Sequence, residues 1–211
     1  MRSDTATGTM RAYQTYTKAY LQRHRDTHSR FAAFGTHQHP YLHATMRELA
    51  ADIAAGGCGP PSLLDYGCGK GRFLEAMRRL GVFGELVGFD PAIPAVAMRP
   101  ERRFDLVTCL DVLDQVEPRF VDAVVCDVAQ FTRAVAVFDI VTKQAKGVNR
   151  KTESPFVWHD RIAKRMQVVA TRLHLAAGYE YEMGAFAQRA IIIARPMEEA
   201  LAPEITRAAP R

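Results

Sequence analysis

The sequence has little of what marks secreted, membrane-bound or zinc-stabilised proteins. Its 211 residues include four cysteines and one tryptophan, and no uninterrupted apolar run reaches the roughly 18 residues needed to cross a bilayer. The cysteines form no CxxC or Cys/His pattern, so neither a disulfide framework nor a metal site is expected. Residues 1–20 lack the apolar core of a secretory signal. These absences predict a cytoplasmic protein without a membrane partner.

Charge is also unremarkable in its distribution. The net charge of +5 comes from 28 basic and 23 acidic residues with no dense basic block, so nucleic acid is not the expected partner. A composition of 48% hydrophobic and 24% charged residues is typical of a globular chain, and 211 residues suffice for one domain. Nothing in these patterns indicates an oligomeric state.

The N-terminal part reads as helical. Tyr13, Tyr16 and Tyr20 recur at the spacing of one helix face from about residue 10, a break falls at 35–40, and a second helix is expected over about 41–55. The tyrosine stripe fits helix packing or, alternatively, a lid over a ligand. Residues 1–56 are therefore expected to form a helical cap belonging to the same unit as the rest.

Strands and helices alternate after residue 57. Strands are expected over 62–66, 85–89, 104–110 and 134–140, and helices over 72–80, 120–131 and 155–177. Two further strand-like runs, 179–186 and 189–194, leave no room for a helix between them and predict an antiparallel hairpin. This α/β order implies a mostly parallel sheet covered on both faces. The core is expected over 57–196, and residues 197–211 are expected to be a flexible tail.

A glycine-rich turn carries the strongest functional signal. Leu63-Leu64-Asp65-Tyr66 is followed by Gly67-Cys68-Gly69-Lys70-Gly71 and then by a helix. Glycines let the backbone approach a ligand closely, and a helix N-terminus offers free N–H groups. Asp90 ends the next strand, where an acid can accept hydrogen bonds from the ribose hydroxyls of a nucleoside. A Walker loop would need Ser or Thr after Lys70, and the dinucleotide fingerprint would need glycine at Arg72.

These residues resemble the signature of the class I S-adenosylmethionine (SAM)-dependent methyltransferases. The run Phe104–Asp114 is similar to that superfamily's fourth-strand motif, with Asp114-Gln115 where Glu-His is usual. The resemblance, to bacterial enzymes of small molecules, implies a Rossmann-like methyltransferase fold with SAM as cofactor and S-adenosylhomocysteine (SAH) as product. The cofactor-binding residues would be Asp65, Gly67, Cys68, Gly69, Gly71, Asp90, Pro91, Leu110, Asp111 and Val112.

The segment between Asp90 and Phe104 departs from that pattern. It contains Pro91, Pro94 and Pro100 and is too short for a crossover helix, a strand and a second helix. A sheet edge shortened after the second strand is therefore expected.

The acceptor side is marked less clearly. Lys143, Asn149 and Arg150 lie in a basic run without acids, so they are candidates for binding an anionic group. His39, His43 and His159 are the candidate catalytic bases, because an imidazole suits deprotonation near neutral pH.

The resulting hypothesis is a methyltransferase acting on an oxygen or nitrogen of a small polar, anionic molecule. Two alternatives stay open: an RNA or DNA methyltransferase, and a non-catalytic SAM-binding partner subunit. Salt-dependent nucleic-acid binding would favour the first alternative, and SAM binding without turnover would favour the second.

Overall fold

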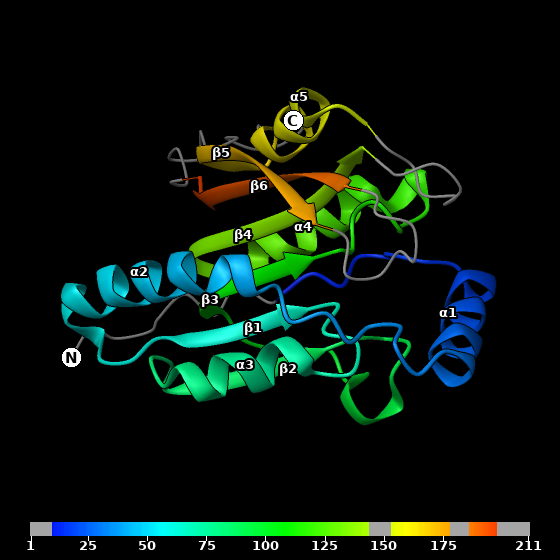
Figure 1. Ribbon diagram of the computed structural model, residues 1–211, viewed down its shortest axis with the longest axis horizontal. Coiled ribbons are helices and arrows are strands. Elements are labelled where there is room, and N and C mark those ends of the chain that lie inside the picture. Colours follow the sequence, from blue (N-terminus) through cyan, green and yellow to red (C-terminus); the bar gives the residue numbers. More distant parts are fainter. Residues whose placement is uncertain (1–9, 144–152, 178–185, 198–211) are drawn as a thin grey trace, which may run out of the picture.

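The chain folds around one six-stranded sheet. The computed structural model describes residues 10–143, 153–177 and 186–197, and its strands run in the order β2-β1-β3-β4-β6-β5 (Figure 1). The four strands β2, β1, β3 and β4 are parallel, whereas β6 is antiparallel to both β4 and β5. The strands are β1 Ser62–Tyr66, β2 Glu85–Phe89, β3 Phe104–Leu110, β4 Thr132–Lys143, β5 Met166–Ala177 and β6 Phe186–Pro196.

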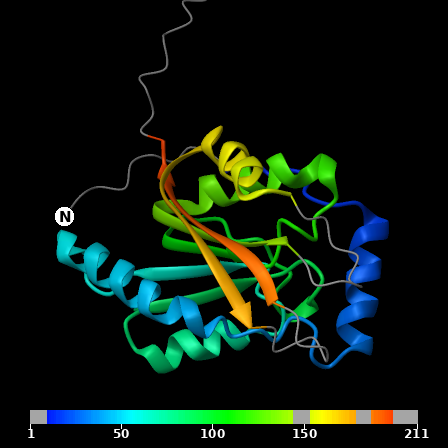
Figure 2. The ribbon, with the colours of Figure 1, turned by 45° about the horizontal axis from the view of Figure 1, so that its top comes forward.

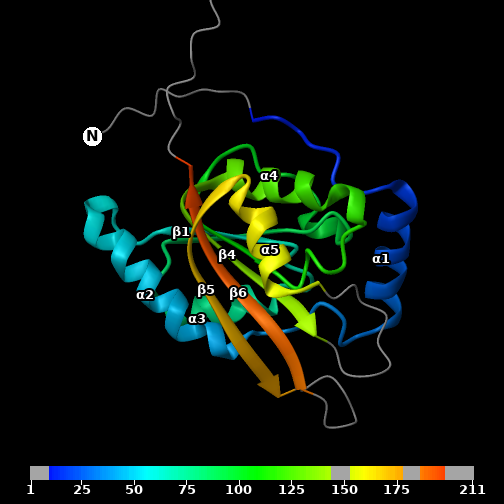
Figure 3. The same ribbon diagram turned by 90° about the horizontal axis from the view of Figure 1, so that it is seen from above.

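Helices cover both faces of this sheet. The pair α2 (His43–Ile53) and α3 (Arg72–Leu80) lies on one face, and α4 (Val121–Phe131) and α5 (Pro155–Ala163) lie on the other (Figure 3). Each face has its own apolar core, with Met46 and Met77 in the first and Phe131 and Trp158 in the second. Within the described ranges, no helix is both long and apolar enough to span a membrane.

The expected fold class is confirmed, including the shortened edge. Between β2 and β3 the chain forms only the short 3-10 turn Pro94–Val96, so β2 is the edge strand on that side. The three prolines and the short length leave no room for another strand–helix unit. Residues 144–152 and 178–185 interrupt the second half of the chain and are not described.

The expected helix over 155–177 is wrong in its second part. The helix ends at Ala163, and Met166–Ala177 is strand β5, paired antiparallel with β6 along its whole length (Figure 2). The antiparallel hairpin therefore exists, but its first strand is β5 instead of the expected run at 179–186, most of which lies outside the described residues. Val169 and Leu173 on β5 are apolar but exposed. The alternation of apolar and polar residues that would predict a strand is therefore weak in this segment.

The first helix also begins later than expected. Helix α1 spans Lys18–Arg30, and the Thr17 side chain caps it by accepting a hydrogen bond from the backbone N–H of Tyr20 at 3.1 Å. Tyr13 and Tyr16 therefore precede the helix, which begins directly after the capping residue Thr17. Helix α1 stands across the carboxyl ends of the parallel strands (Figure 1).

Candidate functional site

A cavity of about 660 Å³ lies at the carboxyl ends of the parallel strands. Its lining includes nine of the ten predicted cofactor-binding residues: Asp65, Gly67, Cys68, Gly69, Asp90, Pro91, Leu110, Asp111 and Val112. Gly71 is the exception, since it forms the N-cap of α3 and does not line the cavity. The fold thus brings the ends of β1, β2 and β3 together around one space.

The glycine turn is held in a conformation that other residues rarely adopt. Gly67 and Gly69 have φ values of +80° and +50°, in the left-handed region. A Cβ at Gly69 would lie 2.7 Å from the backbone oxygen of Gly35, so the two backbones are in close contact. The N–H of Lys70 donates to that same oxygen at 2.8 Å. Gly35, which the sequence reading treated only as a helix break, is therefore a partner of the turn.

Asp90 joins the turn to the end of β2. Its carboxylate accepts hydrogen bonds from the N–H of Gly69 at 3.0 Å and from the N–H of Ala92 at 2.8 Å. The residue is largely buried, but it lines the cavity. Each carboxylate oxygen has two lone pairs and uses one of them here, which leaves further acceptor capacity toward the cavity.

Asp65 is a buried acid at the end of β1. Burial raises its pKa to about 7, against the hydrogen bond that Thr108 donates at 2.8 Å, and the charge of Asp90 adds to the increase. We call Asp65, the turn 67–71 and Asp90 the loop end of the cavity.

Helix α1 and the residues around it cover the cavity. Tyr16, Tyr20, His24 and Phe34 all line it, so part of the tyrosine stripe faces the space while Tyr13 does not. The start of α1 is anchored to the core, because the Thr17 N–H donates to the Glu117 carboxylate at 2.8 Å. The N-terminal segment is therefore one wall of the site.

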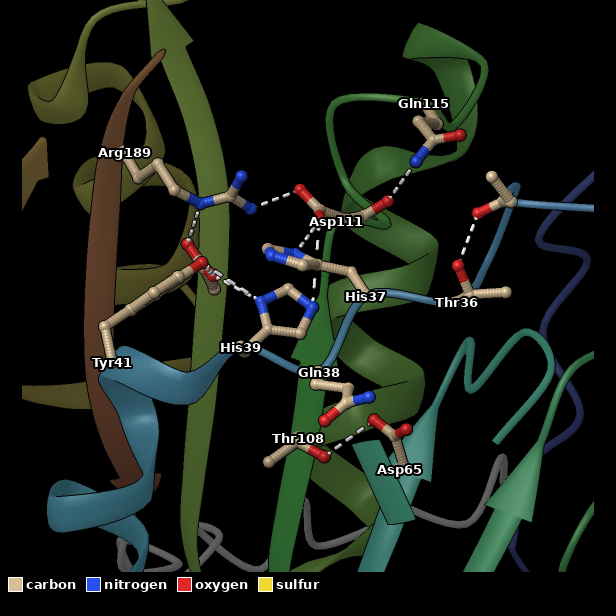
Figure 4. A network of polar contacts seen from close by, with 12 residues as sticks. Thr36, His37, Gln38, His39, Tyr41, Asp65, Thr108, Asp111, Gln115 and Arg189 are labelled. Atoms are coloured by element: carbon tan, nitrogen blue, oxygen red, sulfur yellow. Dashed lines mark hydrogen bonds and ion pairs between the residues drawn. The ribbon is translucent and has the colours of Figure 1, made fainter. Parts of the chain in front are cut away.

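A network of charged residues meets the cavity away from the glycine turn, where His37, His39 and Asp111 are among the lining residues, and Figure 4 shows its contacts. Asp111 directly follows β3 and Asp139 lies within the neighbouring strand β4, and the guanidinium of Arg189 on β6 bridges them. Arg189 Nε donates to Asp139 at 2.8 Å, and Arg189 Nη2 donates to Asp111. Asp111 has a left-handed φ of 57°, and its N–H bonds to the Asp139 carbonyl oxygen at 2.9 Å.

Two histidines complete this network. His39 Nδ1 lies 3.0 Å from Asp139 Oδ2, and His39 Nε2 lies 3.7 Å from Asp111 Oδ2. His37 Nδ1 lies 3.4 Å from that same Asp111 oxygen. The Tyr41 hydroxyl donates to Asp139 at 2.5 Å. We call these residues the histidine–aspartate cluster: His37, His39, Tyr41, Asp111, Asp139 and Arg189.

The contacts within the cluster keep Asp139 and Arg189 charged. Burial alone would raise the pKa of Asp139, but the hydrogen bond from His39 and the charge of Arg189 bring it below its usual range. Burial would likewise lower the pKa of Arg189, but the charges of Asp111 and Asp139 raise it instead. The carboxylate of Asp139 is therefore ionised and the guanidinium charged.

The candidate catalytic histidines are separated by the fold. His39 is buried and lines the cavity. His43 starts α2 and lies with Nε2 3.2 Å from the backbone oxygen of Gln38, and it is not among the cavity-lining residues. His159 is on α5 and borders a different hollow with Ala163 and Met166.

The candidate substrate-binding residues lie at or beyond the limit of the described chain. Lys143 ends β4, while Asn149 and Arg150 fall outside the described residues. Sequence reasoning missed Asp139 and Arg189 as site residues. A signal for Arg189 exists, since it directly precedes the apolar run 190–194 of a central strand, where a lone charge needs a partner.

Comparison with known proteins agrees with this geometry. A family model described as a methyltransferase domain matches residues 34–131. Over 58 residues the chain is 47% identical to a ribosomal protein L11 methyltransferase from Bordetella parapertussis. These 58 residues are 28% of this chain and 17% of that protein. The chain thus spans well under two thirds of the length of this relative.

Two solved structures are similar over most of the chain. The N-methyltransferase NodS from Bradyrhizobium japonicum, in complex with SAH, has a TM-score of 0.56 at 12% identity, covering 85% of this chain and 99% of NodS. A Burkholderia thailandensis 1,6-didemethyltoxoflavin-N1-methyltransferase has a TM-score of 0.55 at 16% identity, covering 93% of this chain and 99% of the other. At these identities the two matches show the fold, which is the Rossmann-like fold expected from the sequence.

Proposed function

We propose that this protein is a SAM-dependent methyltransferase that transfers a methyl group to an oxygen or nitrogen of a small polar molecule. The observation that carries the proposal is the lining of one cavity, which includes the glycine turn and Asp90 together with three members of the histidine–aspartate cluster, His37, His39 and Asp111. The glycine turn and Asp90 suit an adenosyl cofactor, and the cluster supplies polar groups for an acceptor.

The loop end fits SAM. The turn 67–71 would hold the methionine part, and Asp90 would accept hydrogen bonds from the ribose hydroxyls through the lone pairs that Gly69 and Ala92 leave free. A volume of about 660 Å³ lies within the usual range of roughly 300–1,000 Å³ for small-ligand sites. When bound, SAM supplies an electrophilic methyl group on a sulfonium.

The histidine–aspartate cluster is our candidate for the acceptor side. Leu110, Asp111 and Val112 lead from the loop end to the cluster along the end of β3, so both ends border the same strand. Of the three candidate histidines, His39 is the one within the cavity lining, and we propose that it acts together with His37 and Asp111. The main contribution of these groups would be to align the acceptor atom with the methyl group.

A small acceptor suits a cavity that α1 covers. Tyr20, His24 and Phe34 wall the space, which favours a molecule that fits inside over a large macromolecular surface. The similar Burkholderia structure contains bound 1,6-didemethyltoxoflavin, a small molecule. The Bordetella relative is named for a protein substrate, but its match covers 58 residues only. An anionic acceptor remains our proposal from the basic run that includes Lys143 and Arg150.

Calorimetry with the full chain tests the cofactor part of the proposal. SAM and SAH should bind, whereas NAD and ATP should not. Asp90→Ala should weaken SAH binding by about 1.5–3 kcal/mol, the usual contribution of a hydrogen bond to a charged group. Binding of NAD without binding of SAM or SAH would overturn the proposal.

Turnover separates the proposal from its alternatives. Purified protein with labelled SAM should methylate members of a panel of small hydroxyl- and amine-bearing acids. Transfer to RNA or DNA alone would contradict the small-molecule assignment. SAH binding with no transfer to any class of acceptor would support a non-catalytic subunit instead.

A further inference from the structure

Three potential metal ligands converge inside the histidine–aspartate cluster. His37 Nδ1, His39 Nε2 and Asp111 Oδ2 all lie within 4.8 Å of one another. The Asp111 oxygen is 3.4 Å from the His37 nitrogen and 3.7 Å from the His39 nitrogen. Two ligands that each lie about 2.1 Å from a tetrahedral ion are about 3.4 Å apart, so both distances to the Asp111 oxygen are close to those that one shared ion requires.

The hydrogen bonding of His39 leaves a lone pair at the point of convergence. The Asp139 carboxylate only accepts hydrogen bonds, so the His39 nitrogen that lies 3.0 Å from it, Nδ1, carries the proton. In the neutral ring, Nε2 then has a lone pair, and it faces the Asp111 carboxylate at a distance too long for a hydrogen bond. A lone pair opposite a carboxylate is repulsive unless a positive charge lies between them.

The surroundings also match those of known metal centres. A histidine ligand usually donates its second ring N–H to a carboxylate, as His39 does to Asp139. The His39 side chain is only 4% exposed, whereas that of His37 is 29% exposed and lines the cavity.

We propose that His37, His39 and Asp111 bind one divalent transition-metal ion of the zinc type, with its open positions facing the cavity. Two imidazoles and one carboxylate suit Zn²⁺ or Fe²⁺ better than Mg²⁺ or Ca²⁺, which prefer oxygen ligands. An oxygen or nitrogen of the acceptor would occupy an open position, and this last step rests on the proposed methyltransferase function. The sequence did not predict this site, because Asp111 lies far along the chain from both histidines.

Direct metal binding tests the site without any acceptor. The full chain, purified without a histidine tag and stripped with EDTA, is titrated with Co²⁺ while its visible absorption is recorded, and with Zn²⁺ in a calorimeter. We expect a single equivalent of each ion to bind and Co²⁺ to give the absorption of a protein-bound, low-symmetry site. No binding above that of free buffer would overturn the inference.

Matched variants locate the ion. Asp111→Asn keeps a residue type that tolerates the left-handed backbone, and His37→Ala removes a partly exposed ligand, so both should fold. Each should weaken Zn²⁺ binding at least tenfold, while His43→Ala, on the same segment but outside the cluster, should not. Undiminished binding in the first two variants would place the ion elsewhere and overturn the proposal.

A second readout covers a variant that folds poorly. Zn²⁺ should raise the thermal unfolding temperature of the wild type and raise that of Asp111→Asn less, because an ion stabilises only the state that binds it. An equal increase in both proteins counts against the site. SAH titration of the metal-free wild type separates the two proposals. If SAH binds and Zn²⁺ does not, only the proposed metal site is wrong. If Zn²⁺ binds and SAH does not, only the proposed methyltransferase function is wrong.

Discussion

The two ends of the cavity are built in different ways. The loop end comes from one continuous β–α–β unit, in which Asp65, the turn 67–71 and Asp90 lie within 26 residues of sequence. The histidine–aspartate cluster comes from the segment before α2, the residue after β3, the strand β4 and the antiparallel strand β6. The loop end depends on backbone conformation, whereas the cluster depends on buried charges that meet only in the folded sheet. The local motif therefore predicts the loop end, whereas His39 and Asp111 are the members of the cluster that the sequence indicated.

Removing the central cation of the cluster should have the largest effect on stability. Arg189→Met would leave the carboxylates of Asp111 and Asp139 without their shared counter-charge, and the Asp139 side chain is 0% exposed. Breaking a buried ion pair in this way typically costs about 3–5 kcal/mol. We expect that loss in the free energy of unfolding, measured with urea, and SAH affinity within a few-fold of wild type wherever the variant is folded.

A surface ion pair provides the control for this prediction. Arg133 contacts Asp105 at 2.7 Å, but the arginine side chain is 49% exposed. Arg133→Met should cost about 1 kcal/mol or less. If Arg189→Met is no more destabilising than Arg133→Met, the cluster is not held by its charges and the contrast between the two ends fails.

The buried acid of the loop end should make stability depend on pH. Burial raises the pKa of folded Asp65 to about 7 from an ordinary value of 3.8. Between those values the folded protein retains a proton that the unfolded chain has released, so stability falls as pH rises and levels off above about pH 7. Asp65→Asn cannot titrate and keeps an acceptor for the Thr108 hydroxyl. The stability of the wild type relative to this variant should fall by up to about 1.4 kcal/mol per pH unit.

Urea unfolding of both proteins from pH 4 to pH 8 measures this difference. Other titrating groups are common to the two chains and cancel in the comparison. Asp90 and Thr108 are the neighbours that set the Asp65 pKa besides burial, and both are retained in the variant. A difference that is constant with pH would mean that Asp65 is ionised throughout.

The contrast between the two ends also explains what the sequence could predict. The bounds of β1, α3, β2 and β3 agree with the prediction to the residue. Gly67 follows β1, Asp90-Pro91 follows β2, and α3 lies between Gly71 and Gly81, so these ends are marked in the sequence. Met166–Ala177 was misread as helix because its pairing with β6, a long-range contact, decides its structure. Asp139 and Arg189 were missed for the same reason, since their functional surroundings come from strand order and not from spacing.

A substitution within the glycine turn should affect mainly cofactor binding. Gly69 and Gly71 both have positive φ, so alanine at either position carries a similar backbone strain of about 1–2 kcal/mol. Only at Gly69 would the new Cβ meet a neighbour, the Gly35 backbone at 2.7 Å, whereas nothing lies within 4 Å at Gly71. Calorimetry should therefore find SAH binding at least tenfold weaker in Gly69→Ala than in Gly71→Ala. Equal affinities would show that the contact with Gly35 does not shape the turn.

The smallest expected effect concerns the basic residues at 143–151, which we predict to bind a negatively charged group of the acceptor. Arg150 lies outside the described residues, so this prediction rests on the sequence. Residues 143–151 contain four basic residues and no acidic residue, and they begin at the end of β4, the strand that carries Asp139. A guanidinium next to an anionic acceptor would contribute to acceptor binding and not to SAM binding, because the cofactor lies at the loop end. Arg150→Ala should raise the KM for an anionic acceptor several-fold and leave the Kd for SAH unchanged. Arg47→Ala, an exposed arginine on α2, is the control and should change neither constant. An unchanged KM, or a best acceptor that is neutral or cationic, would contradict this prediction. Acceptor selection would then depend on the histidine–aspartate cluster and not on the basic residues.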